Sequence, residues 1–199
     1  MSRKIKIFLA LVVIVVGGYV AGSRLGLSSS NGATDDFKDA RAQGAIVAQD
    51  IVNLSNGLQT DLERVNKLDS EGNYAEALTA TVELLKRTQE VKTKALELSK
   101  QLERMTGALA DIDSALARQA ALESISNRLA LIGRLLSYSD YLGQLFASLN
   151  LRFSGQQLQE NHIKNLIAQV NAEVTAINNF NREASQAMDR FDTIVEQGK

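Results

Sequence analysis

The most constraining feature of the sequence is a series of apolar residues, spaced alternately three and four positions apart, in a chain without proline. This spacing places apolar side chains along one face of an α-helix. Proline interrupts helices and punctuates turns, so its absence favours long helices with few connections. The pattern predicts four helices, at about residues 35–69, 73–106, 110–153 and 156–197.

We therefore expect an all-α fold: an N-terminal transmembrane (signal-anchor) helix, then an up-and-down antiparallel four-helix bundle with coiled-coil-like packing. In the fourth helix Asn181 takes a core position after Ile177, where a buried Asn fixes register at some cost in stability. The third apolar stripe, which we expect to face the core, consists of Leu122, Ile125, Leu129, Ile132, Leu135, Tyr138, Leu142, Leu145 and Leu149.

Turn signals differ in strength along the chain. Gly72, Tyr74 and Ala77 resemble the entry to the second helix of a tetratricopeptide repeat, and this short resemblance implies a tight helical hairpin after the first helix. The end of the second helix is open. It can lie near residues 106–111, near 117–121, or the helix can continue unbroken, and we favour a turn.

The outer face of the second helix carries regularly spaced charges. Glu83 precedes Arg87 by four residues, and Glu90 precedes Lys94 by four. Acid before base at this spacing stabilises an exposed helix face, so we expect these pairs to form within the helix and to be solvated.

The first 22 residues predict export. Three cationic side chains precede an apolar run, and 17 uncharged residues separate Lys6 from Arg24, roughly 25 Å as a helix. The excess of positive charge before the run puts the N-terminus in the cytoplasm and the bundle outside, as a single-pass membrane protein. The alternative is a signal peptide cleaved near Gly22, which would give a secreted protein.

Three segments follow from this interpretation: a signal anchor at 1–22, a Gly/Ser-rich linker at 23–34 and an extracytoplasmic bundle at 35–199. From residue 35 onward, 18 Lys and Arg stand against 23 Asp and Glu, and no basic patch suggests nucleic acid as a partner. The chain has no cysteine, which excludes disulfides and a lipoprotein anchor.

No residue set predicts catalysis, a metal site or a cofactor. His162 is the only histidine, and Gln159 stands where the Glu-x-x-His pair of a di-iron bundle needs its glutamate. No nucleophile elbow or phosphate-binding loop is present in the sequence. We therefore do not expect an enzyme.

The stretch with most resemblance to a ligand site contains Arg134, Tyr138, Asp140 and Tyr141. These side chains could line a pocket between helices for a small polar ligand or a partner. In the competing interpretation Tyr138 fills the core, Tyr141 flanks the seam and Arg134 is solvated.

These features predict a non-enzymatic, membrane-anchored helical bundle outside the membrane that acts as an interaction or scaffolding module. Its partner is another protein or a second copy of the chain. The layout also resembles the ligand-binding part of bacterial chemoreceptors, which implies a small-ligand sensor. No second membrane segment or signalling region follows here, so such a sensor would relay through a partner. A third alternative is a secreted soluble bundle.

Overall fold

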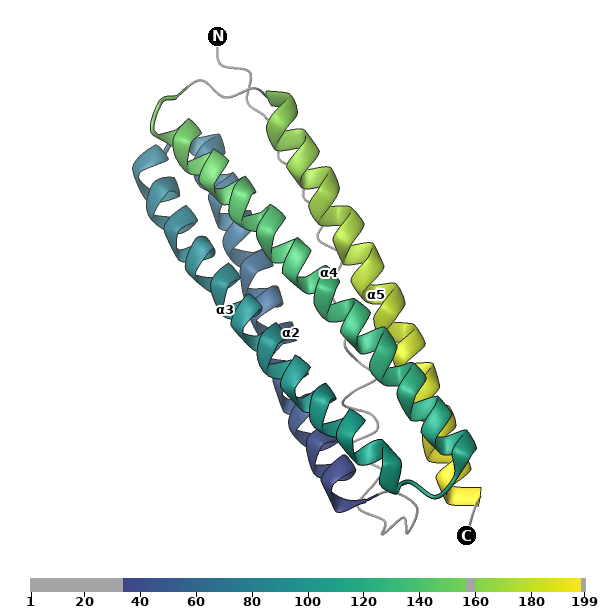
Figure 1. Ribbon diagram of the computed structural model, residues 1–199. Helices are drawn as coiled ribbons and strands as arrows, with labels where there is room; N and C mark the ends of the chain where they lie inside the picture. The colour runs from purple at the N-terminus through teal and green to yellow at the C-terminus, as the bar shows by residue number, and fades with distance from the viewer. Residues whose placement is uncertain (1–33, 157–159, 198–199) are drawn as a thin grey trace.

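The computed structural model describes residues 34–156 and 160–197, which form an all-α structure of four long helices (Figure 1). The helices run alternately up and down along one long axis, and α2 packs against α3, α3 against α4, and α4 against α5. The prediction of an all-α fold with four long helices is confirmed. The expected signal anchor and linker lie outside the described residues. The elements are α2 (Asp35–Glu71), α3 (Tyr74–Gly107), the 3₁₀ helix η1 (Ala108–Asp111), α4 (Ala115–Phe153) and α5 (Glu160–Gln197).

The hairpin between α2 and α3 is built around Gly72. This residue has a φ of 77°, in the left-handed region, where a side chain beyond hydrogen is disfavoured. The backbone N–H of Asn73 donates to the carbonyl of Leu68 at 2.9 Å, which satisfies a carbonyl at the end of α2. Ala77 is fully buried, so the two helices approach closely at the hairpin. The tight turn lies where its glycine predicts it.

The second turn lies at the first of the two expected positions, and the helix does not continue unbroken. α3 ends at Gly107, η1 follows, and Ile112 is extended and fully buried beneath the turn. The Ser114 hydroxyl accepts a hydrogen bond from the N–H of Ala117 at 3.2 Å and caps α4. α4 therefore begins at Ala115, five residues after the predicted start, because the chain between the helices forms a 3₁₀ turn and then an extended residue.

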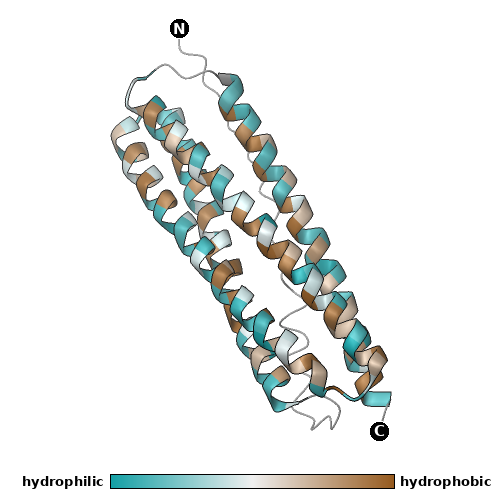
Figure 2. Cartoon of the chain, viewed as in Figure 1, coloured by the Kyte–Doolittle hydropathy of each residue, from teal (hydrophilic) through white to brown (hydrophobic). Residues whose placement is uncertain are grey.

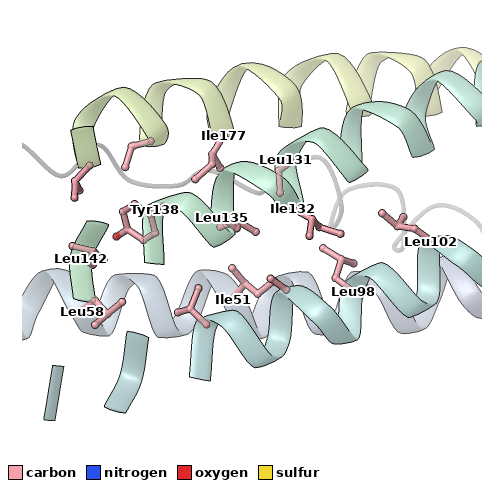
Figure 3. Close-up of a cluster of buried hydrophobic side chains, with 14 of the residues drawn as sticks. Ile51, Leu58, Leu98, Leu102, Leu131, Ile132, Leu135, Tyr138, Leu142 and Ile177 are labelled. Carbon is pink, nitrogen blue, oxygen red and sulfur yellow. The ribbon is translucent and has the colours of Figure 1, made fainter. Parts of the chain in front are cut away.

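Each helix alternates hydrophobic and hydrophilic segments along its length, as amphipathic helices do (Figure 2). The buried side chains from all four helices form one continuous core, part of which is drawn in Figure 3. Asn181 is 6% exposed and occupies the core position that its spacing predicts.

The prediction that Leu122 and Leu129 lie in the core is wrong. Their side chains are 50% and 48% exposed. The other seven members of the predicted stripe are buried, among them Ile125, Ile132 and Leu135. α4 has leucine on both of its faces, so apolar spacing alone selects no unique buried face.

The charges of α3 also differ from their expected pairing. The structure pairs Arg87 with Asp61 of α2 at 2.9 Å and Lys94 with Asp50 of α2 at 3.1 Å. Glu83 lies 3.9 Å from Arg64, also of α2. These pairs form between helices because the spacing of α2 and α3 brings opposite charges within reach across the seam.

Candidate functional site

Tyr138 lies in the core, and its ring is surrounded by apolar side chains that include Leu135 and Leu142 (Figure 3). Among the described residues, no partner forms a hydrogen bond with its hydroxyl. Burial away from water disfavours the phenolate and raises the pKa of Tyr138 well above its ordinary value. The side chain thus occupies the core as in the competing interpretation of this stretch.

The other three predicted residues lie on the surface of α4 or at its margin. The Arg134 guanidinium lies 3.6 Å from the carboxylate of Glu173 on α5. Asp140 pairs with Lys92 on α3, on the opposite side of α4. Tyr141 is half-buried and packs against the core. The structure therefore does not bring the four side chains together, and their role in binding a ligand stays a prediction.

A pocket of about 510 Å³ lies instead in the groove between α2 and α3. Leu54 contributes apolar surface, and the charged side chains of Arg87 and Lys94 alternate with carboxylates. The full lining is Asp50, Asn53, Leu54, Arg87, Glu90, Thr93 and Lys94. Sequence patterns do not indicate this pocket, because its residues come from two helices that are separate in the sequence.

The absence of a side chain at Gly57 lets Arg87 lie against α2. A Cβ atom at Gly57 would be 2.6 Å from Nη1 of Arg87. Across the pocket, two hydrogen bonds raise the pKa of the Lys94 ammonium. The bond to Glu97 has the larger effect and the bond to Asp50 the smaller. Arg87 and Lys94 both lie beside carboxylates of α2, and the pocket suits a small ligand that carries both signs of charge.

Metal chemistry has no support among the described residues. No group of three or more His, Asp or Glu side chains there is arranged to hold a metal ion. His162 is exposed near the beginning of α5.

The outward side of α4 is unusual for an exposed helix face. The positions opposite the core carry a single charge, Asp140, over ten turns, and we name them the α4 outer stripe. Of the eight large apolar side chains exposed in the described part of the chain, four lie on α4. The stripe consists of Ala115, Gln119, Leu122, Ser126, Leu129, Gly133, Asp140, Gln144, Ala147 and Leu151, all of them exposed.

Comparison of the chain with protein-family models, curated proteins and solved structures gives no match. Within residues 34–156 and 160–197, no helix combines the length and the apolar character needed to span a lipid bilayer.

Proposed function

We propose that this protein is a non-enzymatic, membrane-tethered helical bundle that acts outside the membrane as an interaction module. The α4 outer stripe is the observation that carries this proposal. A helix that is apolar on both sides is normally covered on both sides, whereas α4 has the core on one side and solvent on the other. Leu122, Leu129 and Leu151 are the large apolar side chains of the stripe, and exposed apolar surface of this kind marks a surface that binds another protein.

The tether is supported by the sequence of the first 22 residues. Arg3, Lys4 and Lys6 precede the apolar run, and Arg24 alone follows it closely. This asymmetry favours a cytoplasmic N-terminus and an exported bundle. The absence of cysteine agrees with a bundle that relies on its apolar core rather than on disulfides.

Fractionation of cells that express the full chain tests the tether. We expect the protein in the membrane fraction, resistant to alkaline extraction, with the bundle accessible to protease from the outside only. A variant that lacks residues 1–22 should be soluble. Recovery of the full chain in the cytosol would overturn the tether, and recovery of a shortened chain in the medium would identify a cleaved signal peptide.

Capture of partners from solubilised membranes tests the interaction surface. The variant Leu129→Lys places a charge on the α4 outer stripe, and Leu96→Lys places one on α3 at a leucine that is similarly exposed. We expect the protein captured by the wild type, whether a second copy or another chain, to be lost with Leu129→Lys and kept with Leu96→Lys. Equal loss with both variants would contradict a specific surface on α4.

The α2–α3 pocket favours a second candidate function, a small-ligand sensor that relays through a partner. Its mixed charges suit a ligand with an amino and a carboxylate group. A thermal-shift screen of the full chain against such metabolites tests this idea. A true ligand should lose its effect with Arg87→Ala, which removes a pocket cation, and keep it with Lys100→Ala on the exposed side of the same helix.

A further inference from the structure

We propose that residues 115–140 of the α4 outer stripe are covered by the same part of α4 in a second copy of this chain, packed antiparallel about a two-fold axis. The inference rests on the proposed function, because it names the partner of the interaction surface. Three observations carry it: the alternation of large and small residues between positions 122 and 133 of the stripe, the charges of α4 in and beside the stripe, and the length of the predicted linker.

The first observation is that the stripe is complementary in size to itself. Leu122, Ser126, Leu129 and Gly133 follow one another at spacings of four, three and four. A two-fold axis between positions 127 and 128 places Leu122 opposite Gly133 of the second copy and Leu129 opposite Ser126 of the second copy. Large residues then meet small ones, as in well-packed helix interfaces.

Gly133 is the position where this packing is closest. A Cβ atom built there meets nothing within 4 Å, so the helix backbone is open to an approaching side chain. A leucine of the second copy can therefore reach the surface of α4 itself. Glycine in the middle of a helix destabilises it relative to alanine, and close approach of another helix gives Gly133 a structural reason.

The second observation is that the charges beside the stripe are complementary under the same axis. Antiparallel packing brings the same flank of each α4 together. On the α5 side, Glu123 and Arg134 pair with Arg190 and Glu173 of α5 and remain about half exposed. Under this axis Glu123 lies opposite position 132 of the second copy. It is therefore offset by two residues, or about 3 Å along the helix, from Arg134 of the second copy.

The α3 side shows the same relationship. Arg118 is exposed at the α3 edge of the stripe and lies about six helical turns before Asp140, the single charge of the stripe itself. The same axis brings Arg118 within three residues of Asp140 of the second copy, so each flank joins opposite charges twice. Charges at these flanking positions set partner choice and orientation in coiled coils.

The third observation is that antiparallel pairing is compatible with two tethers in one membrane. In each bundle the beginning of α2 lies at the same end as the beginning of α4. In the dimer these two ends are about 40 Å apart along the helix axes. The predicted linker at 23–34 reaches up to about 40 Å when extended. Both copies can therefore insert in the same bilayer, with the paired bundles lying along its surface.

Because the chain has no cysteine, single introduced cysteines test the register directly. Full-length Leu122→Cys and Gly133→Cys proteins are mixed in detergent micelles and oxidised. We expect a disulfide-linked heterodimer, and almost none from either variant alone, since two copies of position 122 would be about 16 Å out of register. Leu96→Cys mixed with Gly133→Cys is the matched control and should not cross-link.

Light scattering of the full chain, corrected for bound detergent, measures the association itself. We expect a dimer that dissociates on dilution, and the dissociation constant should rise at least about 100-fold with Leu129→Lys, because two leucines are lost per dimer. Leu96→Lys should leave it unchanged. Circular dichroism of each variant verifies that the helical content is retained.

The outcomes separate this inference from the proposed function. A chain that is monomeric at all concentrations, or that forms disulfides from Leu122→Cys alone, overturns the antiparallel dimer. If that monomer still loses another captured protein with Leu129→Lys, the interaction module stands. A dimer with the expected cross-link that fractionates in the cytosol supports the dimer and overturns the tether.

Discussion

Arg41 of α2 and Asp192 of α5 form a bidentate ion pair, with Nη1 and Nη2 of the arginine 2.6 and 2.7 Å from the two carboxylate oxygens. Beside it, the rings of Phe37 and Phe191 lie 5.1 Å apart. Throughout the described residues, the Cα atoms of α2 and α5 stay more than 8 Å from one another. These long side chains therefore join the first and last described helices at one end of the bundle.

We predict a measurable coupling between Arg41 and Asp192. A double-mutant cycle with Arg41→Ala and Asp192→Ala should give about 1 kcal/mol in urea unfolding, because the bond is bidentate and half-buried. The coupling should fall as salt is added. The matched control is the exposed pair of Lys67 and Glu71, at 4.0 Å, for which we expect less than about 0.5 kcal/mol. Equal coupling for both pairs would contradict a special role at the bundle end.

We predict that Tyr138→Phe keeps or raises stability, by up to about 1 kcal/mol, because the buried hydroxyl has no hydrogen-bond partner among the described residues. Tyr138→Ala should cost about 3–5 kcal/mol through the cavity it leaves. Chemical denaturation of both variants measures the two effects. A loss of stability above about 1 kcal/mol with Tyr138→Phe would show that the hydroxyl forms a hydrogen bond in the folded protein.

The raised pKa of Tyr138 predicts a pH dependence. Above about pH 10 the tyrosine ionises in the unfolded chain but stays protonated in the fold, so unfolding releases a proton. The free energy of unfolding should therefore keep its full value below about pH 10 and decrease as the pH rises further. Tyr138→Phe should show a shallower fall over the same range, measured by urea unfolding at each pH. Identical slopes would argue against a buried phenol.

Two glycines should respond to alanine in opposite directions. Gly72→Ala should lower stability by about 1 kcal/mol, since its φ of 77° is strained for any residue with a Cβ atom. Gly107 has a helical φ of −59° with open space around it, so Gly107→Ala should raise stability by about 0.5–1 kcal/mol. Thermal unfolding of the two variants side by side checks this, and destabilisation by both would refute the assigned turn geometry.

The two faces of α4 should differ in their sensitivity to truncation. Leu135→Ala removes a fully buried side chain and should cost about 2–5 kcal/mol. Leu129→Ala should cost less than about 1 kcal/mol at concentrations low enough to keep the chain monomeric, because its side chain is half exposed. Denaturation curves at low and high protein concentration measure both. A large loss in the dilute monomer would mean that Leu129 is buried within the chain.

Much of the fold follows from local patterns. The glycine of the first hairpin and the apolar spacing within each helix act through nearby residues, so the number and approximate limits of the helices could be predicted. The buried face of α4 was predicted at seven of its nine positions, and the two errors, Leu122 and Leu129, arise because leucines occur on two of its sides. The predicted ligand residues Arg134 and Asp140 are neighbours in sequence, yet they turn toward different helices.

The sequence by itself determined that this chain forms long helices, since proline is absent and apolar spacing follows the helical repeat. The proposed tether rests on sequence alone, on the basic residues and the apolar run within residues 1–22. Only the tertiary structure decided which leucines of α4 are buried, that Arg87 and Lys94 reach across to α2, and that Arg41 meets Asp192. Periodicity is a property of one helix alone, whereas these choices depend on which neighbour approaches each face.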